Sequence, residues 1–295
     1  MAPITTSTAD GSDNNNNDIK TMKLYTNVER IKNELASRNM LGDDAIAIDP
    51  IVLSEIDSMH YMGNSAVEDA VSALKLDSSR KVLDIGSGFG GPARVLAAKS
   101  NCSVTALELQ RDIHDMGEYL TKRCDLGNRV KHELGDILSL DLHKLGNGPA
   151  SYDGIVSFLV FLHIQDKQSL LERCAQMLTS GGVLYVEDFY SAHPFSQTEV
   201  ESLSKDVYAQ QLPTREEYIA HLEASGFHNI QFIDKSLEWT QYVTERTETF
   251  IANRSNFEKV HGEPTYLSLL HFYRAMTTLF LGKNLGGVRI LAEKK

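Results

Sequence analysis

A short glycine-rich loop behind an acidic residue is the part of this sequence best suited to chemistry. The string VLDIGSGFGGP occupies residues 82–92, so an apolar segment containing Asp84 leads directly into the loop. Glycine allows a tight turn and lets the backbone approach a ligand without a Cβ in the way. Pro92 suits a position near the start of a helix. We therefore expect a ligand-binding turn, and its candidate binding residues are Gly86, Ser87, Gly88 and Gly90.

Asp84 indicates which kind of nucleotide this loop binds. Gly86, Gly88 and Gly91 also fit the GxGxxG pattern of NAD enzymes, but that pattern is weak on its own. An NAD site seats a pyrophosphate at the helix N-terminus, and Asp84 would repel it. S-adenosylmethionine has no phosphate and carries two cationic groups, a sulfonium and an ammonium. Asp84 therefore favours S-adenosylmethionine, and the alternative is an acid that merely caps the turn.

Two further acids extend the expected cofactor site. Glu108 lies 22 residues after Gly86, and its carboxylate is placed to accept hydrogen bonds from both ribose hydroxyls. Asp136 follows the next apolar segment, where it can bind the adenine amine while Ile137 packs on the ring. Leu109, next to Glu108, completes the candidate set. An exposed Glu108 without a ligand is the alternative, but three acids after three successive apolar segments are more specific than any one.

A histidine is the candidate for the reaction itself. His163 follows the apolar segment at 154–158, at the edge where ligands are expected. An imidazole has an ordinary pKa of about 6.5 and can take a proton from an acceptor or orient it. A structural histidine is the alternative. We find no HExxH, no paired CxxC and no carboxylate cluster at ligand spacing, so no metal site is expected.

Alternating segments position these residues in a predicted α/β fold. The expected strands are 81–85, 103–107, 130–133, 154–158 and 183–188. The expected helices between them are 92–99, 113–124 and 167–178. Such alternation is typical of a parallel sheet with crossover helices. Ligands bind beyond the carboxyl ends of such strands, which is where the three acids and His163 fall.

We expect three regions along the chain. Residues 1–20 are a polar tail without the composition for a core. Residues 21–75 hold helices that cover the cofactor site, and residues 76–295 form the catalytic domain with a helical insertion around 190–284 that acts as a lid. The helices expected in the first region are 22–39, 50–59 and 66–74. The elements expected after residue 190 are helices at 216–224, 243–260 and 266–281, a strand at 230–233, and a final antiparallel strand at 287–292.

The composition limits the kinds of partner and the location that we expect for this protein. The chain of 295 residues has 29 basic and 40 acidic residues, a formal charge of -11, which disfavours a nucleic-acid partner. No apolar run approaches the roughly 20 residues that span a bilayer, and the N-terminus lacks an apolar signal core. Three cysteines without a CxxC pair indicate a reducing compartment, so a cytoplasmic location is expected. A homodimer is one of the assemblies that the sequence allows.

These motifs resemble the class I methyltransferases, which have a Rossmann-like fold and use S-adenosylmethionine. VLDIGSGFGG, LEL, GDIL and GGVLYVEDF stand in the expected order, over roughly residues 60–188. The string FLHIQDKQSLLERCAQMLTSGGVLYVEDFY is similar to the phosphoethanolamine and sarcosine/dimethylglycine N-methyltransferases. GFGGPARVLA is also similar to sterol and tocopherol methyltransferases.

The resemblance implies roles for the residues in these motifs. The loop glycines and Asp84 hold the methionine end of the cofactor, Glu108 holds the ribose, and Asp136 with Ile137 holds the adenine. His163 faces the substrate. His60 and Tyr61 lie where N-terminal residues of related enzymes close over the cofactor, and they could contribute an imidazole or a hydroxyl. One departure is Leu159, because the N-methyltransferases of this type tend to have an acid four residues before that histidine.

The sequence therefore predicts an S-adenosylmethionine-dependent methyltransferase that acts on a small molecule, with an amine as the expected acceptor. The first alternative is C- or O-methylation of a sterol, quinol or tocopherol-like acceptor. More remote alternatives are an NAD-dependent oxidoreductase and a non-catalytic cofactor-binding protein. A nucleic-acid aminomethylating enzyme would carry an Asn/Asp-Pro-Pro-aromatic motif after the fourth strand, where this sequence has SFLVF.

Overall fold

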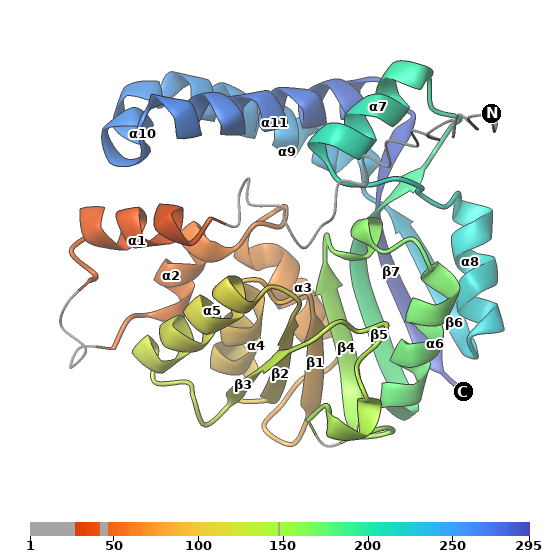
Figure 1. The fold of residues 1–295 in the computed structure, drawn as a ribbon. Coiled ribbons are helices and arrows are strands. Elements are labelled where there is room, and N and C mark those ends of the chain that lie inside the picture. The colour runs from red at the N-terminus through yellow and green to blue at the C-terminus, as the bar shows by residue number, and fades with distance from the viewer. Residues whose placement is uncertain (1–26, 42–46, 147) are drawn as a thin grey trace, which may run out of the picture.

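The computed structural model describes residues 27–41, 47–146 and 148–295, and Figure 1 shows how they are arranged. The predicted tail 1–20 and the first part of the predicted helix 22–39 lie outside the described residues.

A seven-stranded sheet in the order β3-β2-β1-β4-β5-β7-β6 forms the centre of the fold. In chain order its strands are β1 Lys81–Ile85, β2 Ser103–Glu108, β3 Val130–Leu134, β4 Tyr152–Phe158, β5 Leu178–Ser191, β6 Phe227–Asp234 and β7 Leu285–Lys294. Strands β1 to β5 pair in parallel, and β7 runs antiparallel to its neighbours β5 and β6. The predicted parallel sheet with an antiparallel final strand is confirmed.

Helices cover both faces of the sheet because neighbouring side chains of a strand point to opposite faces. In β1, Val82 packs in the cluster formed with α3 and α4, whereas Leu83 packs in the cluster formed with α6 and α8. The helices that flank the sheet are α3 Asn64–Ala73, α4 Gly91–Ser100, α5 Arg111–Arg123, α6 Lys167–Met177 and α8 Arg215–Ala224.

The N-terminal helices pack on α4 and α5 rather than on the sheet. They are α1 Val28–Ser37 and α2 Pro50–Asp57, and the side chain of Asp49 caps α2 by accepting from the Ile51 backbone N–H at 2.8 Å. Their buried residues Ile31, Leu35 and Leu53 join the α5 cluster. This packing places the segment between α2 and α3 beside the glycine loop.

The remaining helices form a layer across one end of the sheet (Figure 1). They are α7 Gln197–Asp206, α9 Ser236–Ala252, α10 Arg254–His261 and α11 Glu263–Leu281. We refer to them as the lid. The lid packs on the sheet through an aromatic cluster that includes Trp239 and Phe280. Gly287 of β7 lies under the Trp239 ring, where any Cβ would collide with it.

The lid differs from the sequence prediction in two ways. The predicted helix 243–260 is two helices, because the chain leaves helical geometry at Asn253 and α10 turns back toward α11. Helix α7 was not predicted, although Ser196 and Glu199 form a capping box at its start. Within the segment 190–284, the predicted helix 216–224 and strand 230–233 correspond to α8 and β6, which belong to the sheet and its covering layer rather than to the lid.

Within the described ranges, no helix is both long and apolar enough to span a membrane. No group of three or more histidine, cysteine, aspartate or glutamate side chains that could hold a metal ion occurs among those residues either.

Candidate active site

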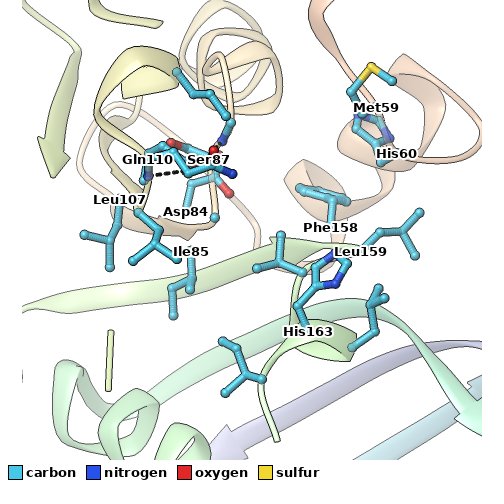
Figure 2. Close-up of a pocket in the computed structure, with 18 of the residues that line it drawn as sticks. Met59, His60, Asp84, Ile85, Ser87, Leu107, Gln110, Phe158, Leu159 and His163 are labelled. Carbon is cyan, nitrogen blue, oxygen red and sulfur yellow. Dashed lines mark hydrogen bonds between the residues drawn. The ribbon is translucent and has the colours of Figure 1, made fainter. Parts of the chain in front are cut away.

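A cavity of about 550 Å³ opens between the carboxyl ends of the parallel strands, the lid and the segment before α3 (Figure 2). Every predicted site residue except Gly90 lines it. These residues are His60, Tyr61, Asp84, Gly86, Ser87, Gly88, Glu108, Leu109, Asp136, Ile137 and His163. The three acids, the loop and the histidine thus meet in one space, as their positions after successive strands predicted.

The glycine loop is held against the end of β2. Gly86 and Ser87 donate their backbone N–H groups to the Leu107 carbonyl, at 2.9 Å each. Gly88 donates to Glu108 Oε2 at 2.9 Å. Both Gly86 and Gly88 have positive φ, 73° and 55°, which only glycine adopts without strain.

Gly90 is the exception among the predicted binding residues. It has a φ of 80° at the N-cap of α4, and a Cβ there would lie 2.7 Å from His132 Cε1, on the side away from the cavity. The need for glycine at this position therefore comes from the turn and from the close approach of His132, and direct ligand contact is not required to explain it.

Asp84 and Glu108 are two buried carboxylates without a cationic partner. Burial, reinforced by the nearby Glu108, raises the pKa of Asp84 to about 7. Burial also raises the pKa of Glu108. The backbone N–H groups of Gly88 and Gln110, which donate to its two oxygens at 2.9 and 2.8 Å, oppose this shift. In the described part of the chain neither acid forms an ion pair, and Asp84 Oδ2 has no hydrogen-bond partner. A buried carboxylate without a partner is costly, so this end of the cavity fits a cationic ligand.

Asp136 and Ile137 complete this end. Asp136 Oδ1 accepts from the Leu138 backbone N–H at 2.9 Å, which fixes the turn after β3. Ile137 is 4% exposed and faces the cavity as an apolar wall. The pair therefore offers one carboxylate oxygen and a flat apolar contact, which suit an aromatic ring bearing an amine.

His163 lies in the short helix η3 Phe161–His163 that follows β4. Its Nδ1 is 3.2 Å from the Tyr208 carbonyl oxygen, so Nδ1 donates and Nε2 carries the lone pair. Burial lowers the pKa of His163 to about 4. The imidazole is therefore neutral near pH 7. It can accept a hydrogen bond from an acceptor group, but it is a weak base in the ligand-free protein.

Lys167 fixes the backbone that carries His163. Its buried Nζ donates to the carbonyl oxygens of Phe161 and Ile164, at 2.6 Å each, and so holds both ends of η3. Lys167 was not among the residues predicted from the sequence. No pattern signals it, because its role depends on the side chain folding back from the first turn of α6.

His60 and Tyr61 line the cavity from the segment between α2 and α3. His60 Nδ1 is 3.0 Å from the Tyr61 carbonyl oxygen, and its buried Nε2 has no partner in the described part of the molecule. The His60 ring lies 5.0 Å from the Phe158 ring (Figure 2). Burial raises the pKa of Tyr61 to about 12, so its hydroxyl stays protonated.

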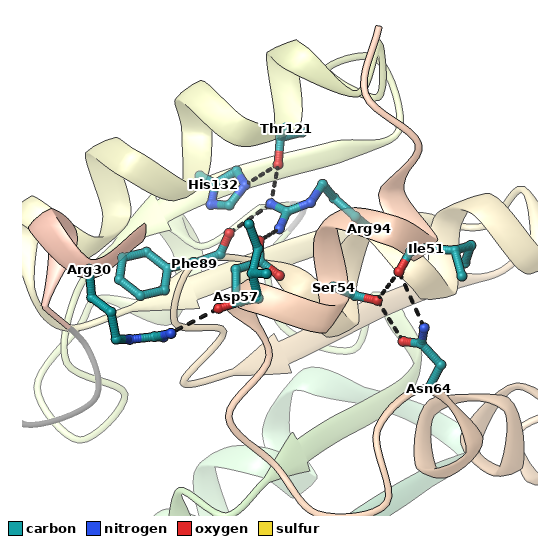
Figure 3. Close-up of polar contacts among 10 residues, drawn as sticks. Arg30, Ile51, Ser54, Asp57, Asn64, Phe89, Arg94, Thr121 and His132 are labelled. Atoms are coloured by element: carbon teal, nitrogen blue, oxygen red, sulfur yellow. Dashed lines mark hydrogen bonds and ion pairs between the residues drawn. The ribbon is translucent and has the colours of Figure 1, made fainter. Parts of the chain in front are cut away.

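A buried ion pair ties this segment to the glycine loop (Figure 3). Arg94 of α4 is fully buried, pairs with Asp57 at the end of α2, and donates to the Phe89 carbonyl at 2.7 Å. Arg30 of α1 donates to the Ile56 carbonyl at 3.3 Å. Burial raises the pKa of Asp57 to about 6 although Arg94 opposes the shift. Neither Asp57 nor Arg94 was predicted from the sequence as a functional residue.

The lid contributes lining residues that the sequence could not assign. They are Arg246 from α9, together with Phe272 and Tyr273 from α11. A helix pattern alone does not show which face of a lid meets a cavity.

Residues 60–261 match the family model described as a methyltransferase domain. This range contains the glycine loop, the three acids and His163. The chain belongs to this methyltransferase family. The prediction of an S-adenosylmethionine-dependent enzyme with the class I fold is confirmed, and S-adenosylmethionine is its cofactor.

Two relatives of this methyltransferase are named as N-methyltransferases. The phosphoethanolamine N-methyltransferase of Plasmodium falciparum is 26% identical over 256 residues, which cover 84% of this chain and 90% of that protein. The sarcosine/dimethylglycine N-methyltransferase of Halorhodospira halochloris is 26% identical over 153 residues. These residues cover 52% of this chain and 53% of that enzyme, so the match spans about half of each.

Solved structures share the fold of this methyltransferase. Haemonchus contortus phosphoethanolamine N-methyltransferase 2, in complex with phosphomonomethylethanolamine and S-adenosylhomocysteine, superposes with a TM-score of 0.73 at 19% identity. The match covers 81% of this chain and 54% of that one.

Proposed function

We propose that this methyltransferase transfers the methyl group of S-adenosylmethionine to an amine nitrogen of a small molecule. The observation that carries the proposal is that one cavity joins two buried, unpaired carboxylates to a neutral histidine in an apolar surrounding. The carboxylate end suits the cationic cofactor, and the neutral histidine suits the uncharged amine group of an acceptor. The relatives named above, which act on amines, support the same reaction.

Each residue of the expected cofactor site would bind a different chemical group of S-adenosylmethionine. The Asp84 carboxylate would bind the ammonium of the methionine part, near the backbone of the 86–88 loop. Glu108 would bind the ribose hydroxyls, and Asp136 the adenine amine against Ile137. Bound this way, S-adenosylmethionine supplies an electrophilic methyl group on a sulfonium, with a neutral thioether as the leaving group.

The protein's own contribution to the reaction is positioning. An amine lone pair forms the new N–C bond as the S–C bond breaks, and the proton on the product nitrogen must then leave. Because charge moves between groups without increasing, orientation carries much of the acceleration, of the order of 7–11 kcal/mol in favourable cases. His163 Nε2 would accept a hydrogen bond from the amine N–H and align its lone pair. The low pKa of His163 favours orientation over full proton removal.

An apolar acceptor is the second candidate, and the lining at the histidine end favours it. Leu159 stands where related N-methyltransferases tend to have an acid, and the walls near it are apolar. These walls are formed by Phe158, Leu162, Phe189, Val207 and Phe272. C- or O-methylation of a sterol or quinol would suit this surface. Aromatic faces also stabilise a developing ammonium, however, which keeps an amine in first place.

A panel of acceptors with methyl-labelled S-adenosylmethionine separates the two candidates. We expect label in products of small primary or secondary amines and none in sterols or quinols. Label in a sterol or quinol, with no amine accepted, would contradict the amine assignment. His163→Ala provides the second arm: turnover should fall strongly while S-adenosylhomocysteine affinity stays unchanged. Unchanged turnover would make His163 structural.

A further inference from the structure

The cavity holds one positive side chain that the reaction above does not use. Among the described residues that line it, Arg246 is the single arginine or lysine. The acids of the cavity have other places: Asp57 pairs with Arg94, and Asp166 caps α6 by accepting from the Ser169 N–H at 2.9 Å. Asp84 and Glu108 lie beside the glycine loop. No carboxylate of the described chain forms an ion pair with Arg246.

The Arg246 guanidinium lies among tyrosine rings rather than acids. It is 5.0 Å from the Tyr61 ring centroid, 5.6 Å from that of Tyr242 and 4.4 Å from that of Tyr273. These rings offset part of the loss of water around the charge. Buried Nε and Nη2 nevertheless have no hydrogen-bond partner. The guanidinium is thus held between the tyrosine rings and still has N–H donors that can bind a ligand.

Arg246 also lines a second hollow of about 320 Å³ between α9 and α11. The guanidinium therefore forms part of the wall shared by the two spaces, and a group bound to it can be reached from either one. A planar guanidinium with free N–H donors matches the two oxygens of a carboxylate or a phosphate.

We propose that Arg246 binds an anionic group of the methyl acceptor, a carboxylate or a phosphate, so that the acceptor is an organic anion with an apolar body. The inference deepens the proposed function and rests on the cavity being the acceptor site. The three tyrosines hold the guanidinium in position, and the apolar walls near His163 take the body of the acceptor. The opposite view is that Arg246 only joins α9 to α11 and to Tyr61.

Binding of matched probes tests the proposal on the full chain saturated with S-adenosylhomocysteine. The probes are phenylacetate, phenyl phosphate and neutral phenylacetamide, titrated by calorimetry. We expect at least one anion to bind about tenfold or more tighter than the amide, as charge-assisted hydrogen bonds provide. The preferred anion identifies the group as carboxylate or phosphate. If the amide binds as tightly as both anions, the proposal is wrong, whatever the variants do.

Three variants show whether Arg246 causes the preference. Arg246→Gln should remove most of it, by about tenfold or more, while leaving amide affinity unchanged, and Arg246→Lys should retain part of it. Arg274→Gln is the matched control, because it removes the same charge from an exposed position of α11 beside Tyr273. A preference that survives in Arg246→Gln would overturn the assignment. Loss of S-adenosylhomocysteine binding by the wild-type protein would instead contradict the proposed function.

Discussion

At the scale of single residues, the sequence predicted the residues at the cofactor end of the cavity but not those at the acceptor end. Asp84 and Glu108 stand at the ends of apolar strands, so backbone geometry alone brings them to the cavity. Arg246 lies on α9, whose rotation is set by the burial of Trp239 and Val243 in the aromatic cluster with α11, and no local pattern encodes that. Gly90 was assigned to the ligand because its turn resembles a binding loop, whereas its Cβ position faces His132.

The first prediction concerns Glu108→Gln. The change removes the charge and one acceptor from a buried position, and it should weaken S-adenosylhomocysteine binding by about 1–3 kcal/mol. Calorimetry at constant pH measures this directly. Glu118→Gln, an exposed change on α5, is the matched control and should leave the affinity unaltered. Equal affinities for wild type and Glu108→Gln would remove Glu108 from the binding residues.

The second prediction concerns pH and Asp84. Burial raises the pKa of Asp84 to about 7, and an ammonium is bound best by the ionised form. Affinity for S-adenosylmethionine should therefore rise as pH increases, with a change of about tenfold between pH 6 and pH 8. The stability of the ligand-free protein depends on pH in the opposite direction. The raised pKa of Asp84 stabilises the folded state at low pH, and this contribution is lost as pH rises through about 7. Asp84→Asn should abolish both dependences, and a slope that persists in Asp84→Asn would assign them elsewhere.

At the scale of elements, strands and crossover helices followed from periodicity, while the short connecting elements did not. β1 has its predicted bounds because an apolar run meets glycine at Gly86. The helix η3 and the break at Asn253 depend on contacts made only after folding, such as the bonds from Lys167 to the backbone of η3. Elements that hold functional groups were thus the less predictable ones.

The third prediction concerns the positioning of His163 by Lys167. Lys167→Met keeps the length of the side chain but leaves the carbonyl oxygens of Phe161 and Ile164 without their donor. Turnover should fall while affinity for S-adenosylhomocysteine is retained, because the 86–88 loop is held by hydrogen bonds to Leu107 and Glu108 and not by Lys167. Lys205→Met, on an exposed position of the lid, is the control. Equal loss of turnover and of cofactor affinity in Lys167→Met would indicate general unfolding instead.

At the scale of the whole molecule, a buried ion pair joins the N-terminal helices to the sheet. Sequence patterns predicted the helices of both parts, but not that Asp57 and Arg94 would meet across them. Both side chains are buried, so each charge depends on the other. The arrangement links α2 to α4 and to the backbone of the glycine loop at Phe89.

The fourth prediction tests this link. Asp57→Ala leaves the Arg94 charge buried without its partner, and loss of one partner of such a pair costs about 3–5 kcal/mol of the free energy of unfolding. Urea denaturation monitored by circular dichroism measures the change. Glu55→Ala, an exposed change on the same helix, should cost far less. Equal stabilities of the two variants would show that the pair does not hold the N-terminal helices.

The central claim is that buried carboxylates at neighbouring strand ends hold a cationic nucleoside without phosphates. Calorimetric titration of the full chain at pH 8 with S-adenosylmethionine, and separately with NAD, tests it most directly. We predict saturable binding of S-adenosylmethionine, weaker binding by Asp84→Asn, and no binding of NAD. Binding of NAD in the absence of any binding of S-adenosylmethionine would contradict the account.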